Sequence, residues 1–394
     1  MENRPLKEKI GQAVAGLQEC LAELSDWLYE HPELGGLEHL AVQRLTEELK
    51  AEGFAVETGL AGLPTAFKAT FSLGAPGPVV GFLAEYDALP GIGHGCGHNI
   101  IAASCLGSAI ALARVLNGTA GTVVVFGTPA EETTGGKIQM TEAGVFNGLD
   151  AVMSVHPANR TSVGGSSLAS HPLEISFRGR AAHAAAAPQE GINALDALLQ
   201  TFAAMKALKH HLRDDVRMPG IITQGGAAPN IVPDFAAARF SLRAADREYL
   251  ELVIGKVKNC ARGAALATGA EVSFNHYEPL FDALWNNPVL QEAFRVNLTE
   301  LGYTVQILPP QERGGSTDVG NVSQVVPTIH PDIAIGPADL QSHTREFAAA
   351  TRTAAGRRGL YDAAHAMALT AVDVFTRPEL RARIKEEFHH RGKI

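Results

Sequence analysis

The segment GIGHGCGHN, residues 91–99, places a thiol at position 96 and an imidazole at position 98 of a glycine-rich loop. Glycine loses more conformational entropy on folding than any other residue. Four glycines in nine positions therefore indicate that the backbone must follow a course that other residues do not tolerate. Three kinds of site use such a loop: a phosphate cradle, a cysteine nucleophile with its base, and a metal centre.

The phosphate-binding alternative fails on spacing. A dinucleotide-binding fingerprint that begins at Gly91 needs its third glycine at position 96, which is Cys96. One that begins at Gly93 needs it at position 98, which is His98. The chain also contains no GK[ST] phosphate loop. We exclude this kind of site.

The cysteine-nucleophile alternative stays open. A helix that follows Cys96 and is capped by Asn99 would lower the pKa of the thiol through its amino-terminal dipole. A nucleophile also needs a base within hydrogen-bond distance of the sulfur. His98 is too close in sequence to be an obvious one.

The metal-binding alternative gains from two other segments. Glu131 and Glu132 follow the apolar run at 122–127, and His156 follows the run at 151–155. A thiolate, imidazoles and carboxylates are ligands that zinc or manganese accepts. One of the adjacent carboxylates can bind metal while the other takes a proton from water, whose pKa a metal lowers to ~7. Passing that proton to a leaving amine is amide hydrolysis.

These residues must be positioned by a sheet and its helices. The runs VVGFLA (79–84), TVVVFG (122–127) and AVMSV (151–155) are typical of central strands covered on both faces, and residues 100–116 predict a crossover helix. This β-α-β pattern predicts an α/β fold with a largely parallel sheet, whose chemistry lies beyond the carboxyl ends of the strands. Leucine spacing predicts two further helices, over 17–28 and 37–49.

The pattern changes after about residue 170. Four strand-like segments and two helical ones follow in the order β-α-β-β-α-β, which matches a ferredoxin-like unit. We therefore expect an inserted domain over 170–280. The parent domain would comprise 1–169 and 281–394.

Composition excludes several classes of partner. The formal net charge of −9 argues against nucleic acid and anionic membranes. The first residues, MENRPLKEKIGQAV, contain no apolar signal core, and no uninterrupted apolar run reaches membrane-spanning length. With four cysteines in that context, we expect a cytoplasmic protein without disulfides.

The motifs together resemble the co-catalytic metallopeptidases that include aminoacylase-1 and carboxypeptidase G. The likeness is to their cysteine-bridged amidohydrolase branch, and within it to the subgroup of aminoacylase-1-like-2 proteins and p-aminobenzoyl-glutamate hydrolase subunits. The motifs that carry it are HPELGGLE (31–38), AEYDALPGIGHGCGHN (84–99), TPAEETTGGK (128–137), HP (156–157), GRAAHAAAAPQEGINALDAL (179–198), GGAAPNIVP (225–233), GGSTDVGNVSQVVPTIHP (314–331) and SHT (342–344).

The resemblance implies two divalent metal ions per subunit, zinc or manganese, and assigns roles to residues of the metal centre. Cys96 would bridge the two ions, with His98 and Glu132 on one side and His156 and His343 on the other. Glu131 would be the general base, and Asp87 would orient a ligand from behind. His343 is identified by the resemblance alone.

The resemblance also implies that the inserted domain is a lid through which a homodimer forms. His183 would reach the partner subunit's site and polarise the scissile carbonyl. Asn230 and Arg243 would hold carbonyl and carboxylate groups of the substrate. An arginine fork suits a carboxylate, which favours N-acyl amino acids, acyl-glutamates or dipeptide-like substrates.

This sequence departs from the family's motifs at three places, which limits how far the family's residue roles apply to it. The His-x-Asp of the wider family is Glu85-Tyr86-Asp87 here, so the ligands should follow the cysteine branch. Asn99 stands where that branch usually has Asp, which alters either metal affinity or helix capping. The segment 314–318 leaves the specificity pocket undefined. A binding protein of the same fold, with or without metal, remains the alternative from another class.

Overall fold

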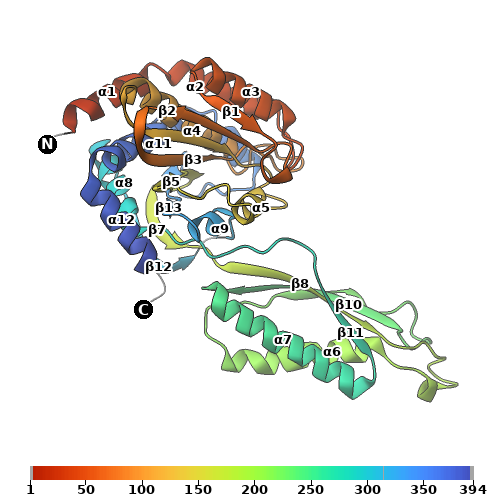
Figure 1. The fold of residues 1–394 in the computed structure, drawn as a ribbon. Helices are drawn as coiled ribbons and strands as arrows, with labels where there is room; N and C mark the ends of the chain where they lie inside the picture. Colours follow the sequence, from red (N-terminus) through yellow and green to blue (C-terminus); the bar gives the residue numbers. More distant parts are fainter. Residues whose placement is uncertain (1–2, 314, 391–394) are drawn as a thin grey trace. The chain divides into compact units, whose positions relative to one another are not determined.

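The computed structural model describes residues 3–313 and 315–390. The chain divides into two compact units (Figure 1). One comprises the residues up to Ser166 and those from Leu284 onward, and the other is Ser167–Ala283. The boundaries expected at 170 and 280 both fall inside the second unit. Gly314, in the segment expected to shape the specificity pocket, lies outside the described residues.

The first unit is built on a six-stranded sheet in the order β1-β2-β4-β3-β5-β13. Strand β3 pairs in parallel with β4 and β5, and β13 pairs in parallel with β5, whereas β1 and β2 form an antiparallel edge. The largely parallel sheet predicted from the apolar runs is confirmed. The strands are β1 (Ala55–Thr58), β2 (Phe67–Ser72), β3 (Gly74–Ala84), β4 (Thr119–Gly127), β5 (Ala151–Met153) and β13 (Thr328–Ile329).

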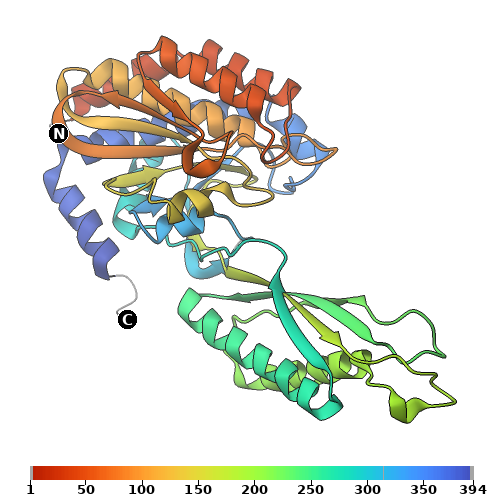
Figure 2. The ribbon, with the colours of Figure 1, turned by 45° about the vertical axis from the view of Figure 1, so that its right-hand side comes forward.

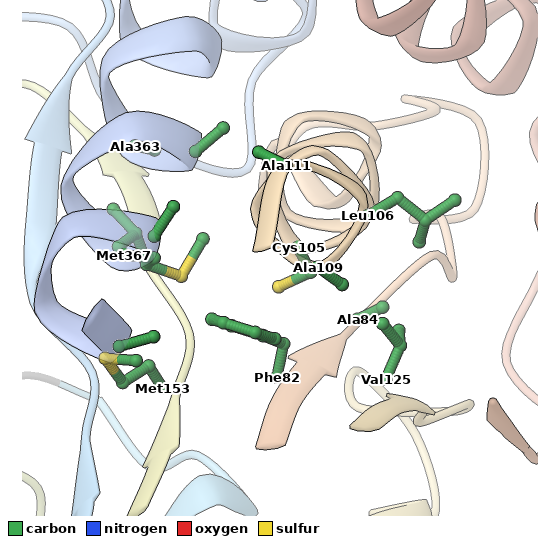
Figure 3. Close-up of a cluster of buried hydrophobic side chains, with 14 of the residues drawn as sticks. Phe82, Ala84, Cys105, Leu106, Ala109, Ala111, Val125, Met153, Ala363 and Met367 are labelled. Carbon is green, nitrogen blue, oxygen red and sulfur yellow. The ribbon is translucent and has the colours of Figure 1, made fainter. Parts of the chain in front are cut away.

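Helix α4 (His98–Leu116) is the crossover between β3 and β4. It is apolar around its whole circumference because helices cover it on one side and the sheet on the other (Figure 3). A side chain at Gly107 would come within 2.6 Å of Cδ1 of Leu21 and 3.2 Å of Cβ of Ala364, so two neighbouring helices pack closely against α4 at this glycine. The helix is long and apolar enough to cross a membrane, but 89% of the relevant window is buried inside the protein, as in a core helix.

The remaining helices of this unit lie around the sheet (Figure 2). They are α1 (Arg4–Ala15), α2 (Gln18–Glu30), α3 (His39–Ala51), α5 (Gly136–Glu142), α8 (Pro288–Glu300), α9 (Val319–Ser323), α10 (Arg345–Ala350), α11 (Ala354–Thr376) and α12 (Pro378–His390). A second small sheet has the order β12-β7-β14-β6. Its strands are β6 (His156–Ala158), β7 (Ser162–Ser166), β12 (Gln306–Arg313) and β14 (Asp332–Ala334).

The second unit has the order β-α-β-β-α-β expected from the sequence. Its antiparallel sheet runs β11-β8-β10-β9, and its two helices pack against the sheet through one hydrophobic cluster. Side chains of Asn193 and Asp246 cap the two helices by accepting backbone N–H groups. The elements are β8 (Ala169–Arg178), α6 (Ala194–Leu208), β9 (Gly220–Gln224), β10 (Phe235–Ala244), α7 (Arg247–Thr268) and β11 (Glu271–His276).

Candidate active site

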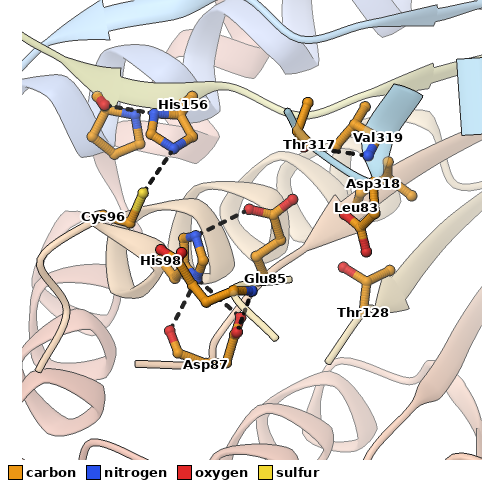
Figure 4. Close-up of polar contacts among 12 residues, drawn as sticks. Leu83, Glu85, Asp87, Cys96, His98, Thr128, His156, Thr317, Asp318 and Val319 are labelled. Carbon is orange, nitrogen blue, oxygen red and sulfur yellow. Dashed lines mark hydrogen bonds and ion pairs between the residues drawn. The ribbon is translucent and has the colours of Figure 1, made fainter. Parts of the chain in front are cut away.

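All five predicted metal ligands and Glu131 gather at one edge of the first unit. Three overlapping groups have donor atoms within 4.8 Å of one another: Cys96, His98 and His156; Cys96, Glu132 and His343; and His98, Glu131 and Glu132. Most of the segments that carry them follow β3, β4 and β5, as expected for the carboxyl ends of parallel strands. His343 comes instead from the loop before α10. Figure 4 shows the thiol of Cys96 directed at His156, and His98 in contact with Glu85 and Asp87.

Cys96 lies at the centre of this arrangement. Its Sγ is 3.5 Å from Nε2 of His156 and 3.5 Å from Nε2 of His343. Nε2 of His343 is in turn 3.6 Å from Oε1 of Glu132. The thiol is therefore shared by two groups of donors, which is the position a bridging ligand needs.

Two backbone features bring the thiol and the imidazoles this close. A side chain at Gly97, whose φ is 80°, would come within 2.8 Å of the ring of Pro157, next to His156. His343 adopts a left-handed φ of 62°, rare for a residue with a side chain, and its N–H donates to the carbonyl of Gly95 at 2.8 Å. The glycines of the loop thus allow close approach of the segments that carry the donors.

Asp87 orients His98 from behind. Nδ1 of His98 lies 2.9 Å from the carbonyl oxygen and 3.0 Å from Oδ1 of Asp87, which places the proton on Nδ1 and leaves the lone pair on Nε2. The other carboxylate oxygen of Asp87 accepts the N–H of Glu132 at 2.9 Å. One carboxylate therefore fixes two of the segments that carry donors.

The electrostatics of the cluster favour a cation. Burial would raise the pKa of the Cys96 thiol, but the imidazoles of His156, His343 and His98 together outweigh it and hold that pKa well below its usual value. Burial would lower the pKa of His156, but Cys96 outweighs it and raises that pKa to about 10. Burial, followed by the charge of Cys96, raises the pKa of Glu132 to about 7. A cation between Cys96 and Glu132 would let both groups ionise.

The donor set also passes a test of fit for a metal. Nε2 of His98 and Oε1 of Glu132 are buried and make no hydrogen bond in the part of the chain that the structure describes, although Glu85 and His343 lie within ion-pair range of them, at 3.4 Å and 3.6 Å. Buried polar atoms are nearly always satisfied, so two such atoms within one cluster indicate that something else binds them. Imidazole nitrogen, carboxylate oxygen and thiolate sulfur together suit zinc.

The expected role of Asn99 as a helix cap is wrong. Helix α4 begins at His98, its N-cap is Gly97, and no side chain caps it. Asn99 is buried inside the first turn and donates to Ser25 and Thr351, on α2 and before α11. The amide therefore joins three helical segments, and its donation to the carbonyl of Ser25 is a contact that a carboxylate could not make.

A buried ion cluster behind the site was missed from the sequence. Nζ of Lys137 lies 2.6 Å from Oδ1 of Asp318 and 2.8 Å from Oε1 of Glu85, and none of these side chains is more than 1% exposed. Oε2 of Glu85 is 3.4 Å from Nε2 of His98. Burial raises the pKa of Glu131 well above its usual value, Glu85 and Asp318 add to this, and Lys137 opposes it. A lone lysine after two glycines gives no sequence signal for such a role.

We expect Lys137→Met to destabilise the fold by about 3–5 kcal/mol, because it leaves two buried carboxylates without their common cation. The measurement is the free energy of unfolding from chemical denaturation. Lys256→Met, at an exposed position of α7, is the matched control and should change it by less than about 0.5 kcal/mol. Equal small effects of both variants would contradict the role assigned to Lys137.

The remaining predicted residues belong to the second unit. The backbones of residues 182–184 and 230–232 pair, which brings His183 and Asn230 side by side. Nδ1 of His183 accepts the N–H groups of Ala185 and Ala186, so the ring proton lies on Nε2. Arg243, on β10, lines a cavity of about 770 Å³ with Arg217, Lys206 and several apolar side chains.

The geometry supplies what the cysteine-nucleophile alternative lacked, because two imidazoles lie beside the thiol. A nucleophile needs only one base, however, and that alternative does not account for the buried atoms of His98 and Glu132 that make no hydrogen bond.

Comparison with known proteins separates these alternatives. Residues 81–364 match peptidase family M20/M25/M40. The Xaa-Arg dipeptidase of Mus musculus is 37% identical over 97% of this chain and 92% of its own length. A p-aminobenzoyl-glutamate hydrolase polypeptide of Escherichia coli K12 is 28% identical over 96% of this chain and 94% of its own length.

Solved structures agree on the fold. A dinuclear metal-binding peptidase of the M20 family from Bacillus subtilis superposes with a TM-score of 0.71 at 24% identity, covering 92% of this chain and 99% of that one. An aminobenzoyl-glutamate utilization protein from Klebsiella pneumoniae gives 0.71 at 19% identity, with 93% and 99% coverage. The chain therefore belongs to peptidase family M20/M25/M40 and is a metal-dependent hydrolase of amide bonds.

Proposed function

We propose that this protein is a cytoplasmic, homodimeric amidohydrolase that uses two zinc or manganese ions to cleave an N-acyl amino acid, acyl-glutamate or dipeptide-like substrate. The observation that carries the proposal is the position of Cys96 between two groups of donors. Cys96 would be shared by the two ions, which His98 and Glu132, and His156 and His343, would also hold. When bound, such ions polarise a carbonyl group and lower the pKa of water.

Residues of this chain perform the proton transfers. Glu131 accepts a proton from the attacking water and passes it to the nitrogen of the leaving amine. The Nε2–H of His183, whose proton is fixed by the contacts at Nδ1, donates to the carbonyl oxygen as negative charge develops there.

The names of the relatives and the chemistry of Arg243 support the substrate class. The similar proteins include an Xaa-Arg dipeptidase and a p-aminobenzoyl-glutamate hydrolase, whose names describe substrates that carry a free carboxylate. A guanidinium binds a carboxylate through two parallel hydrogen bonds. Arg243, with Asn230, is the group that we propose for this contact.

An exposed sheet edge supports the homodimer. Strand β9 is the edge strand of the antiparallel sheet of the second unit, all five of its residues are exposed, and Ile221 is 66% exposed. An apolar edge strand with free N–H and C=O groups is a template for pairing with another chain. A second copy of β9 is the occupant that we propose.

The dimer leads to a complementation prediction. We expect Glu131→Ala and His183→Ala to be inactive separately, and their mixture to recover about a quarter of wild-type activity. Half of randomly mixed dimers are hybrids, and each hybrid restores one of its two sites if His183 acts across the interface. The measurement is turnover after mixing. No recovery in dimers shown to exchange subunits would argue against action across the interface.

The test of the function itself is release of free amine from a panel of substrates. The panel contains p-aminobenzoyl-glutamate, hippurate, N-acetyl amino acids, β-alanyl dipeptides and Xaa-Arg dipeptides, with added manganese or zinc and a chelator control. We expect chelator-sensitive release from at least one member. Silence across the panel from protein that binds metal would favour the binding-protein alternative.

A further inference from the structure

The turn that presents Glu131 and Glu132 begins with an unfavourable backbone conformation. Ala130 has a φ of 62°, a left-handed value that L-residues other than glycine rarely adopt. Its carbonyl accepts the N–H groups of Thr133 and Gly135, which closes the turn. Strained residues persist only where the surrounding structure holds them.

The N–H of Ala130 is bound by a residue 92 positions earlier in the chain. Oε1 of Glu38 accepts this N–H at 2.7 Å, and Oε2 accepts the hydroxyl of Thr65 at 2.7 Å. The hydroxyl of Tyr86 donates to the carbonyl of Thr65. All four residues are at most 1% exposed. Glu38 thus joins the turn of Glu131 and Glu132 to the Glu85–Asp87 segment that orients His98.

Glu38 can bind the N–H of Ala130 because Glu33, and not Glu38, accepts the N–H groups at the start of α3. Glu38 directly precedes α3 but makes no side-chain cap to it. Glu33 instead accepts the N–H groups of Leu40 and Ala41 in the first turn of α3. The two acidic residues of the HPELGGLE motif therefore have different functions.

The HPELGGLE motif also packs directly against the turn that begins at Ala130. A side chain at Gly35 would come within 2.9 Å of Cα of Ala130 and 2.3 Å of Oγ1 of Thr133. At the next position, Gly36, nothing lies within 4 Å of an added Cβ. Glycine at 35 is required by the close approach of the loop to the turn.

We propose that Glu38 is a positioning residue of the hydrolase, which holds Ala130 in its left-handed conformation and so fixes Glu131 and Glu132 in the site. The inference rests on the proposed function of these two glutamates. It assigns the HPELGGLE motif a role in the reaction. The mechanism above does not use this motif.

The decisive variant is Glu38→Ala. We expect kcat to fall by about 10- to 100-fold with KM within about twofold, because small displacements of catalytic groups are costly. Hydrogen–deuterium exchange of residues 128–136 should rise in the metal-free protein as well. Glu38→Gln keeps an oxygen that can accept the Ala130 N–H, and it should retain most of kcat.

A second substitution tests the strain directly. Glycine adopts a positive φ without steric cost, so Ala130→Gly should restore part of kcat in the Glu38→Ala background. Glu33→Ala is the matched control, because it removes an acceptor of two N–H groups from the same loop. It should lower the unfolding temperature but leave kcat and exchange at 128–136 unchanged.

Equal losses of kcat in Glu38→Ala and Glu33→Ala, with unchanged exchange at 128–136 and no restoration by Ala130→Gly, would overturn the proposal. If Glu38→Ala does not fold, Gly35→Ala decides, because it should displace the turn and raise exchange at 128–136. Gly36→Ala strains its own backbone at a φ of 84° but places no atom near the turn, so it should lower stability without raising that exchange. Wild-type protein that is inactive on the panel would refute the proposed function. The exchange measurement would still decide whether Glu38 holds the turn.

Discussion

Glu131→Gln is expected to keep its metal content and lose turnover by about 100- to 10,000-fold, the contribution of a general base. The amide has the shape of the carboxylate but cannot accept a proton. The measurements are kcat on the active member of the panel and metal content by elemental analysis. Glu142→Gln, at an exposed position of α5, is the control and should leave both unchanged.

The stability of the Glu131→Gln variant shows whether turnover is lost because the base is missing or because the protein is misfolded. Burial, Glu85 and Asp318 all disfavour the negative charge of Glu131, so a neutral amide should leave the metal-free protein at least as stable as the wild type. We expect the midpoint of denaturation to stay the same or rise. Turnover retained in a fully folded Glu131→Gln protein would eliminate the proposed base.

Apolar patterning was sufficient to predict the parts of the fold that are buried on both sides. Strands β3 and β4 and helix α4 lie in one continuous core. Their sequences are therefore almost wholly apolar, which is why these elements could be predicted. The small second sheet was not predicted. Its strand β12 contains Pro309 and Pro310 and shows no alternation, and its pairing with β7 shifts register there.

Some residues of the candidate site could not be predicted from the sequence, for a different reason. Cys96 and His98 stand out because glycines surround them. His343, Lys137 and Glu38 are single polar residues whose environment is made by segments distant in the sequence. A glutamate before a helix ordinarily favours the helix dipole, and only the contact between Glu38 and Ala130 reveals another function.

Cys96→Ala should lower metal affinity by at least about 100-fold, more than is lost when only an outer contact of a ligand is removed. The thiol belongs to two of the three donor groups, so its loss weakens both at once. The pKa of His156 should also fall from about 10, because the thiolate is what raises it against burial. Metal content and a histidine titration by NMR measure the two effects.

The control for this variant is Cys260→Ala, which removes a half-buried thiol of α7 that lies in none of the candidate metal groups. It should leave metal content and turnover unchanged. Unchanged metal content in Cys96→Ala would refute the bridging role. If that protein were also inactive, and wild-type turnover resisted a chelator but not an alkylating agent, Cys96 would be the nucleophile. The neighbouring imidazoles of His156 and His343 lower the pKa of this thiol whether it binds metal or attacks a substrate. In this case their effect would stabilise a nucleophilic thiolate rather than a metal ligand.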